Sequence, residues 1–195
     1  IKDRKGQAAA LGLENDNEVC PYLAKQMANG AGKSKMVEDG PVKEVKLIGE
    51  DADLRKLPIT IHSHGDAGRY LGSGVTITRD PETGIRNESI LRVQLTDDPH
   101  KAPFWMAARH NYQHYLKYVE MDEPMPMAFA IGLHPVYEIM SNWSGIHKDF
   151  DELEYAAGVL GEEIEMVKCE TIDLEVPAHA EVIIEGTVHP TDRMM

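Results

Sequence analysis

The feature that most constrains the fold of this chain is a turn sequence placed between two apolar, β-branched segments. Residues 80–84 read Asp-Pro-Glu-Thr-Gly, and proline at the second position with a closing glycine is typical of a type I turn. Residues 74–79 and 88–95 flank this turn and are rich in isoleucine, leucine, threonine and valine. Two such segments joined by a short turn predict an antiparallel β-hairpin.

The other periodic segments are short, and strands outnumber helices among them. Alternating or continuously apolar patterns predict strands at residues 42–48, 59–62, 127–133, 164–169, 175–176 and 181–186. Helical spacing and helix-start signals predict helices at residues 22–27, 101–118, 135–140 and 151–160. Because strands and helices do not alternate regularly, the sequence favours an α+β fold with an antiparallel sheet or barrel over a parallel Rossmann sheet.

Composition is that of a folded globular protein and argues against two kinds of partner. The 195 residues are 42% hydrophobic and 27% charged. The formal net charge of -13 would repel a phosphate backbone, and no basic patch offsets it, so no nucleic-acid partner is expected. No membrane-length apolar run or signal peptide is visible, and Cys20 and Cys169 lie far apart. We therefore expect a cytoplasmic protein with reduced thiols and no membrane partner.

One polar constellation lies on the strand predicted after the turn. Alternation along a strand creates two faces, with Asn87, Ser89 and Leu91 on one and Glu88, Ile90 and Arg92 on the other. The Asn87 amide oxygen can meet a metal or a phosphate, and Arg92 can present its planar guanidinium to a carboxylate. The alternative interpretation of Arg92 is an exposed strand residue that pairs with Glu88.

Two histidines one helical turn apart form a second constellation. His110 and His114 would lie on one face of the helix predicted at residues 101–118, and a pair at this spacing can ligate a metal. No glutamate stands between them in the arrangement of zinc proteases, so a structural or surface role is the preferred interpretation of His114. His110 borders apolar residues and is the better candidate ligand.

Acidic residues lead into the helix predicted at residues 151–160. They are Asp149, Asp151, Glu152 and Glu154. Most are interpreted as solvated acids that favour the first turn of a helix. One of them, facing inward, could complete a site of oxygen and nitrogen ligands for Mn²⁺ or Mg²⁺, and the sequence leaves open which one.

Two further motifs are interpreted as structural. The Gly-Lys-Ser run that ends at Ser34 departs from the phosphate-loop pattern, because Met27 stands where the first glycine belongs and no apolar strand precedes it. His62 and His64 could form a catalytic pair, but histidines at a strand end beside a turn are more often structural or surface groups.

The order and spacing of several short motifs resemble those of the UbiD family of prenylated-FMN-dependent decarboxylases. The matching segments are residues 57–59, 66–70, 74–84, 87–94, 109–110, 130–132, 152–156, 167–178 and 180–186. The resemblance covers roughly residues 40–191, which is most of the chain.

The resemblance implies a metal site, a cofactor site and a reaction. Asn87, His110 and Glu152 are implied to hold Mn²⁺ or Mg²⁺ that bridges to the phosphate of prenylated FMN, with K⁺ as a further candidate cation. The implied cofactor-binding residues are Asn87, Ser89, Ile90, Leu91, Arg92, Arg109, His110 and Glu152. Arg92 is implied to be catalytic within an arginine–glutamate network. The implied reaction is reversible, non-oxidative loss of CO2 from an aromatic or α,β-unsaturated carboxylic acid.

The resemblance also implies an architecture, a β-rich split barrel of the flavin-reductase type with flanking helices. Residues 1–50 are then expected to be a remnant of an N-terminal α/β domain and linker, and residues 51–195 the prenylated-FMN-binding domain. The catalytic glutamates of the family lie in a Glu-Gly-Pro-Phe-Gly-Glu motif, which should begin just beyond Met195 and precede a C-terminal domain. This part alone is therefore expected to lack turnover, and the full-length protein is expected to be a homo-oligomer.

Two alternatives to a decarboxylase remain open at this point. One is a non-catalytic protein that shares the split barrel and binds flavin without decarboxylating a substrate. The other is a structural metal-binding domain without flavin.

Overall fold

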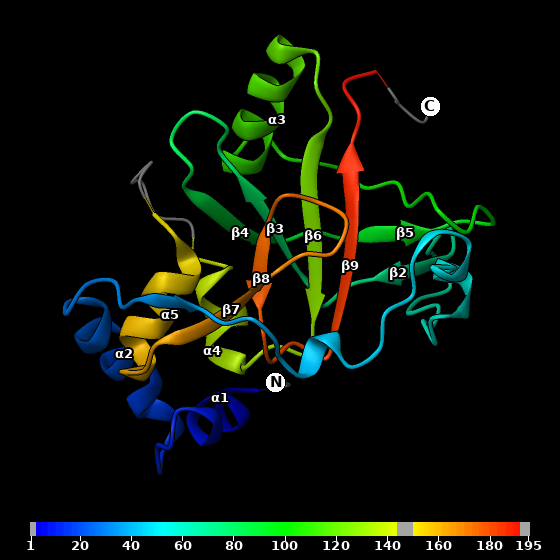
Figure 1. The fold of residues 1–195 in the computed structure, drawn as a ribbon. Coiled ribbons are helices and arrows are strands. Elements are labelled where there is room, and N and C mark those ends of the chain that lie inside the picture. Colours follow the sequence, from blue (N-terminus) through cyan, green and yellow to red (C-terminus); the bar gives the residue numbers. More distant parts are fainter. Residues whose placement is uncertain (1–2, 144–149, 192–195) are drawn as a thin grey trace.

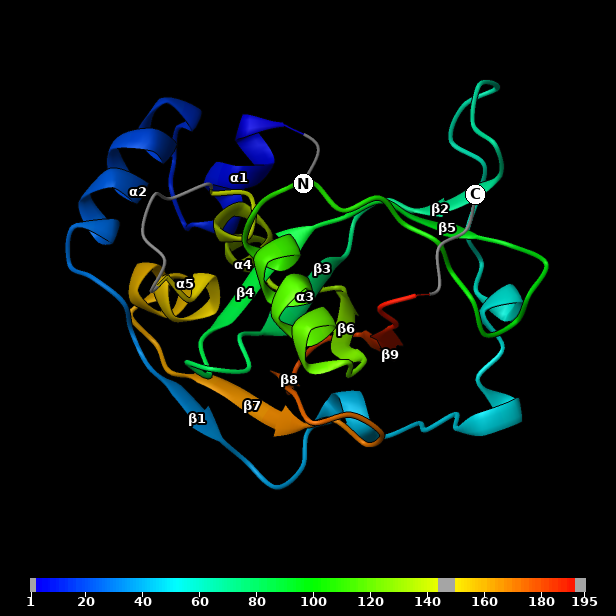
Figure 2. The same ribbon diagram turned by 90° about the horizontal axis from the view of Figure 1, so that it is seen from above.

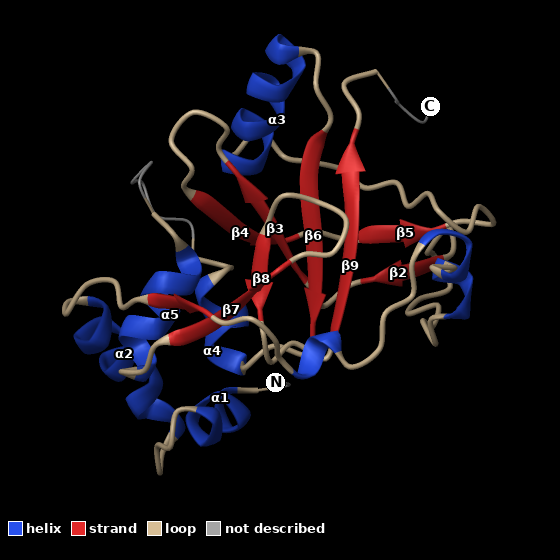
Figure 3. Ribbon diagram, in the orientation of Figure 1, coloured by secondary structure: helices blue, strands red, loops and turns tan. Residues whose placement is uncertain are grey.

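The computed structural model describes residues 3–143 and 150–191, in which one α-helix lies at one end of the main strands and the other four gather near the opposite end (Figures 1 and 3). The helices are α1 (Arg4–Ala10), α2 (Val19–Met27), α3 (His110–Met121), α4 (Pro135–Met140) and α5 (Glu152–Leu160). The strands are β1 (Ser34–Met36), β2 (Arg69–Leu71), β3 (Val75–Arg79), β4 (Arg86–Ile90), β5 (Val93–Leu95), β6 (Met125–Ile131), β7 (Ile164–Lys168), β8 (Glu175–Pro177) and β9 (Val182–Val188). No helix within the described ranges has the length and apolar content that a membrane crossing requires.

The strands form three sheets. The main sheet has the order β4-β3-β6-β9 and is antiparallel throughout. The second sheet has the order β1-β7-β8, in which β1 runs parallel to β7, and the third is the antiparallel pair β2-β5. The α+β class predicted from the sequence is therefore confirmed. Among the described residues the sheets do not close into a barrel, so the split barrel is not confirmed and stays a prediction.

The predicted hairpin is present as β3 and β4. The Gly84 backbone N–H donates to the Asp80 carbonyl over 2.9 Å, and Gly84 has a φ of 74°, a value that glycine adopts without strain. Strand alternation then sends Asn87 and Ser89 to one face of β4 and Glu88 to the other. These two faces supply different parts of the cavity described below.

Two hydrophobic cores lie on opposite faces of β6. The larger core joins the main sheet to α4, α5, β7 and β8, and its most buried large side chains are Ile77, Met140, Leu153, Met166 and Leu174. The smaller core joins β2 and β5 to β6 through Leu71, Val93, Leu95 and Phe129. Figure 2 shows the pair β2-β5 to one side of the main sheet and α2 with α5 to the other. The β2-β5 pair therefore meets the main sheet through side chains rather than through a shared ladder.

The glycine-rich segment near residue 30 lies directly against α5. The Gly32 N–H donates to the Glu154 carbonyl over 2.7 Å, and an ideal Cβ on Gly158 would lie 2.3 Å from the carbonyl oxygen of Gly30. Ser34 then begins β1, which pairs with β7. Close backbone packing accounts for these glycines, in agreement with their interpretation as a structural motif.

Two of the predicted strands are wrong. Residues 42–48 alternate in polarity, but the first two belong to a 3₁₀ turn at Pro41–Lys43, and the segment pairs with no strand among the described residues. Val45 is consequently 75% exposed. Residues 59–62 are likewise unpaired, and Ile61 is exposed. Alternation favours a strand only where a neighbouring edge is available to complete the hydrogen bonds.

A third predicted strand and one predicted helix have different boundaries. Residues 88–95 form two strands, because β4 pairs with β3 whereas β5 pairs with β2. The helix predicted from residue 101 begins at His110, since the preceding chain runs extended beside β5 and Pro103 accepts from the Gln94 N–H over 2.8 Å. Arg92 therefore stands at the junction between two sheets. The short elements α1, β1 and β2 were not predicted, because their sequences show no hydrophobic periodicity.

Gly158→Ala should lower the free energy of unfolding, although alanine usually stabilises a helix interior. The added Cβ would meet the Gly30 carbonyl oxygen at 2.3 Å, so α5 and the glycine-rich segment must separate, at a cost of about 1–3 kcal/mol. Urea unfolding measures the difference. Gly72→Ala is the matched control because a Cβ there meets nothing within 4 Å. Equal effects of the two substitutions would contradict the prediction.

Candidate functional site

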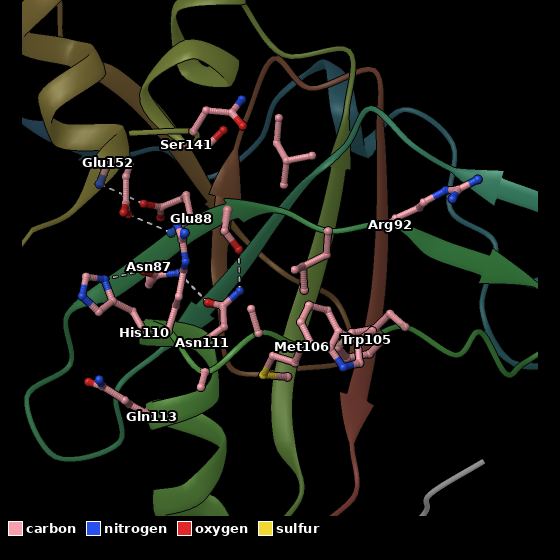
Figure 4. A pocket seen from close by; sticks show the side chains of 18 of the residues that line it. Asn87, Glu88, Arg92, Trp105, Met106, His110, Asn111, Gln113, Ser141 and Glu152 are labelled. Atoms are coloured by element: carbon pink, nitrogen blue, oxygen red, sulfur yellow. Dashed lines mark hydrogen bonds between the residues drawn. The ribbon is translucent and has the colours of Figure 1, made fainter. Parts of the chain in front are cut away.

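A cavity of about 970 Å³ lies where β4, the start of α3 and the start of α5 meet (Figure 4). All eight residues predicted to bind a cofactor line it: Asn87, Ser89, Ile90, Leu91, Arg92, Arg109, His110 and Glu152. These residues come from segments far apart in the sequence, so the fold has gathered them. A cavity of this volume suits a cofactor-sized ligand.

The three predicted metal ligands lie together at one end of the cavity (Figure 4). Asn87 comes from β4, His110 is the first residue of α3, and Glu152 is the first residue of α5. Asn87 Oδ1 and His110 Nδ1 are 3.1 Å apart. Adjacent ligands of an octahedral cation bound at about 2.1 Å are separated by about 3 Å, so these two atoms have suitable spacing.

The donor set at this end includes an amide. No group of three histidine, cysteine or acidic side chains that could hold a metal occurs within residues 3–143 and 150–191. The combination of amide oxygen, imidazole nitrogen and carboxylate nevertheless suits Mn²⁺ or Mg²⁺, which favour oxygen ligands and accept nitrogen.

Two glutamates join β4 to α5 by reciprocal hydrogen bonds. The Glu88 N–H donates to Glu152 Oε2 over 2.8 Å, and the Glu152 N–H donates to Glu88 Oε2 over 3.0 Å. The Leu153 N–H also donates to Glu88 Oε2, over 3.3 Å. Glu88 is 1% exposed, and its Oε1 has no hydrogen-bond partner among the described residues. Its carboxyl group caps the start of α5 and so brings Glu152 beside Asn87.

Acidic groups dominate the electrostatics of this region. Burial raises the pKa of Glu152 to about 7, and burial together with the charges of Asp151 and Glu152 raises the pKa of Glu88 well above its ordinary value. Arg86 opposes this effect, since its guanidinium lies 2.8 Å from Asp151 and 3.8 Å from Glu88 Oε1. Arg86 pairs with Asp151, Glu88 and Glu175 and forms no ion pair with Glu152 among the described residues, so the Glu152 carboxyl group could serve a cation in the neighbouring cavity.

The structure separates the roles of the acids that lead into α5. Glu152 lines the cavity, whereas Asp151 caps the helix by accepting from the Glu154 N–H over 3.0 Å. Asp149 lies outside the described residues. Among the described acids of this segment, Glu152 is therefore the one that lines the cavity. Composition alone could not indicate which of them faces inward.

Beside Asn87, Asn111 is the centre of a buried hydrogen-bond network. Asn111 Oδ1 accepts from Asn87 Nδ2 and from Thr78 Oγ1, while Asn111 Nδ2 donates to Thr76 Oγ1 and to Ser89 Oγ. All four hydrogen-bonding positions of this amide are thus used. The residue is 4% exposed, so water does not compete for these partners.

His114 extends this network away from the cavity. Its Nδ1 lies 3.0 Å from Thr78 Oγ1, and the side chain is buried. Burial lowers the pKa of His114 to about 4, so the imidazole is neutral near pH 7. His114 does not line the cavity, in contrast to His110 one turn earlier.

Arg92 lies at the other end of the cavity (Figure 4). Its guanidinium pairs with Asp66 and stacks over the Tyr70 ring, 4.0 Å from the ring centroid. The ion pair holds the pKa of Asp66 below its ordinary value. The alternative pairing of Arg92 with Glu88 is not formed, since the guanidinium near Glu88 belongs to Arg86. The side chain of Arg92 is 55% exposed, which leaves donors available to a ligand.

Sequence reasoning missed four residues that organise the site. Asp66 and Tyr70, which hold Arg92, lie in a segment that carries the family resemblance, and this could have singled them out. Asn111 directly follows His110, but nothing in its spacing indicates a network. The sequence suggests for Glu88 only a role as the partner of Arg92. His62 and His64 are exposed and do not line the cavity.

Comparison with known proteins identifies the family to which this fold and cavity belong. The family model UbiD, described as the 3-octaprenyl-4-hydroxybenzoate carboxy-lyase Rift-related domain, matches residues 34–195. The chain therefore belongs to the UbiD family, as its motifs predict.

Curated relatives are considerably longer than this chain. Anhydromevalonate phosphate decarboxylase of Methanothermobacter thermautotrophicus is 40% identical over 137 residues, which are 70% of this chain and 32% of that protein. An uncharacterized protein of Aquifex aeolicus is 35% identical over 161 residues, which are 83% of this chain and 33% of that protein. The chain thus spans about a third of the length of these relatives.

A solved structure shows the same arrangement. The UbiD-class enzyme HmfF from Pelotomaculum thermopropionicum, in an evolved dimeric form in complex with prFMN, matches with a TM-score of 0.91 and 38% identity. The match covers 100% of this chain and 45% of the HmfF chain. The α+β arrangement described above is therefore that of part of a UbiD-class enzyme.

The buried neutral His114 predicts a loss of stability in mild acid. Its pKa is about 4 when folded against an ordinary value of 6.5, so the unfolded chain binds more protons between these values. Stability from this residue therefore falls as the pH drops from 6.5 towards 4. In urea unfolding across this window, His114→Gln should lose less stability than the unsubstituted protein, by roughly 1–3 kcal/mol.

The matched control for this pH experiment is the exposed His64, which lies outside the network. His64→Gln should follow the unsubstituted protein across the same pH range. A His114→Gln profile that is parallel to both would contradict the buried, neutral state of His114.

Proposed function

We propose that this chain is the metal and cofactor-phosphate part of a UbiD-type decarboxylase that acts with prenylated FMN. The reaction is the reversible, non-oxidative loss of CO2 from an aromatic or α,β-unsaturated carboxylic acid. The observation that carries the proposal is the 3.1 Å approach of Asn87 Oδ1 to His110 Nδ1 in a cavity that Glu152 also lines. The prFMN complex of HmfF, which shares this fold at 38% identity, supports the choice of cofactor.

In this proposal the metal is Mn²⁺ or Mg²⁺, with K⁺ as a further candidate cation. Asn87, His110 and Glu152 would hold the divalent ion through one oxygen, one nitrogen and one carboxylate, which leaves positions for phosphate oxygens and water. The surrounding acids would otherwise repel a phosphate. A bound cation would therefore offset the repulsion between the cofactor phosphate and the acidic side chains of the cavity wall.

The start of α3 is proposed to face the cofactor phosphate. Arg109 occupies the cap position without a side-chain cap hydrogen bond, so the first N–H groups of this twelve-residue helix remain available. Arg109 and His110 both line the cavity. A helix N-terminus, a guanidinium and a metal ligand on one short segment suit a phosphate.

Arg92 is the proposed catalytic residue. When bound, the prenylated flavin supplies the electron sink for breaking the bond to CO2. The planar guanidinium of Arg92 binds and orients the substrate carboxylate, and its contacts with Asp66 and Tyr70 hold it in place. Ser89, Ile90 and Leu91 form the wall between Arg92 and the metal end.

The whole enzyme is proposed to extend beyond these residues. Because the chain spans 45% of the HmfF chain, we assign the acid that protonates the product carbon to the remaining part of the protein. Turnover is accordingly expected of the full-length protein and not of these 195 residues alone. Residues 1–50 are proposed to belong to an N-terminal α/β domain and linker, and residues 51–195 to a split-barrel cofactor domain. A cytoplasmic homo-oligomer completes the proposal.

His110→Ala should lower metal and flavin occupancy together, because the cation joins the protein to the cofactor phosphate. Occupancy is measured as manganese by elemental analysis and as flavin by absorbance, on full-length protein co-expressed with the prenyltransferase that makes the cofactor. The expected loss in metal affinity is at least about 10- to 100-fold, which is the loss typical of removing a residue that only orients a ligand. His179→Ala, at an exposed histidine outside the cavity, should retain both. Unchanged occupancy in His110→Ala would refute the metal site.

Arg92→Ala in the full-length protein should reduce decarboxylation by at least about 100-fold while the cofactor stays bound, because the substrate carboxylate loses its orienting partner. Product formation and flavin absorbance are measured on the same sample. Arg55→Ala is the matched control, since the side chain of Arg55 is half exposed, like that of Arg92, and pairs with Asp53 outside the cavity. Activity retained in Arg92→Ala would exclude a catalytic role.

A further inference from the structure

An asparagine ligand poses a problem of orientation. Its side chain ends in an oxygen that can hold a cation and an NH2 group of nearly the same shape that cannot. Asn87 can serve the proposed metal site only if its oxygen faces His110. Something in the protein must therefore fix the rotation of this amide.

The direction of the network behind Asn87 is fixed by one backbone carbonyl. The Ser89 carbonyl oxygen can only accept, and Thr76 Oγ1 lies 2.8 Å from it, so the single hydroxyl hydrogen of Thr76 is donated there. Thr76 Oγ1 can then only accept from its other neighbours. The Asn111 atom that faces it, at 3.2 Å, must consequently be the NH2 group.

This assignment determines the rest of the chain of hydrogen bonds. With Asn111 Nδ2 donating to Thr76 and to Ser89 Oγ, Asn111 Oδ1 must face Asn87. An acceptor at that position requires a donor from Asn87, so Asn87 Nδ2 points to Asn111. Asn87 Oδ1 is left facing His110 Nδ1 at 3.1 Å.

Burial of both amides makes the opposite orientation of Asn87 energetically costly. Asn111 and Asn87 are both buried, and a rotated Asn87 would place its oxygen against Asn111 Oδ1 and its NH2 group towards the proposed cation. Both contacts would be unfavourable, and the first of them would lie between two buried side chains.

We infer that Asn111 is a positioning residue for the metal site, in that it presents the Asn87 oxygen and not its nitrogen to the cation. This inference rests on the proposed function, because it assumes that Asn87 is a ligand. Asn111 also lines the cavity, but in this inference it acts on the cation through Asn87 and not as a ligand. Its role is carried by the acceptor oxygen that it offers to Asn87 Nδ2.

Two substitutions separate the acceptor from the shape of this side chain. Asn111→Leu keeps a similar size but removes the acceptor, so Asn87 is free to rotate. Asn111→Asp keeps an oxygen facing Asn87 and should rescue the orientation. The readout is the dissociation constant for Mn²⁺, measured by electron paramagnetic resonance on the full-length protein without flavin.

We expect Asn111→Leu to weaken Mn²⁺ binding about 10- to 100-fold, as for other residues that orient metal ligands, and Asn111→Asp to bind Mn²⁺ at least as tightly as the unsubstituted protein. The control for general destabilisation is Leu174→Ala, a truncation in the larger core away from the cavity. It should leave Mn²⁺ binding unchanged. Unchanged binding in Asn111→Leu, or equal losses in the Leu and Asp variants, would overturn the inference.

Failure of the proposed metal site is a distinct outcome. Unsubstituted protein that binds no Mn²⁺ would overturn that site before any variant is compared. Should Asn111→Leu not fold, the nearly isosteric Thr76→Val removes an anchor of the same network. Weaker Mn²⁺ binding is expected there too, and an unchanged dissociation constant would overturn the role of Asn111.

Discussion

The arrangement of the site depends on the pair of reciprocal hydrogen bonds between Glu88 and Glu152. These residues belong to β4 and α5, which are separated by more than sixty positions in the chain. Because Asn87 adjoins Glu88, the same contact sets the distance between two of the proposed metal ligands. A buried carboxyl group is costly, and the N–H groups at the start of α5 offset part of that cost. Stability and site geometry are therefore coupled through one contact.

The two faces of β4 make different contacts, because side chains alternate along a strand. One face carries Glu88 and contacts α5, whereas the other carries Asn87 and Ser89 and contacts the Asn111 network of α3. A single short strand thus contacts two helices that do not follow one another in sequence, and each helix carries one of the proposed metal ligands. A shift of one residue in the register of β4 would exchange these faces and dismantle both contacts.

Much of the fold and part of the candidate site could be predicted from local sequence patterns, whereas the remaining features depend on tertiary contacts. The β3-β4 hairpin followed from its turn, and the α+β class from the irregular order of elements. The break of the strand at Leu91 and Arg92 could not be predicted, because each half pairs with a different sheet. Nor could the pattern select Glu152 among neighbouring acids, since that choice depends on which side of α5 meets β4. The contact of Asp66 with Arg92 also arises only once β2 and β5 have paired.

The same break has a consequence for how such a site can adapt. The proposed metal ligand Asn87 belongs to the main sheet, whereas Arg92 borders the small β2-β5 pair, which meets the main sheet through the side chains of the smaller core. Changes in the packing of Leu71, Val93 or Leu95 would therefore alter the reach of Arg92 and leave the ligand geometry intact. In the proposed enzyme, the distance between the metal site and Arg92 could therefore change while the metal ligands keep their arrangement.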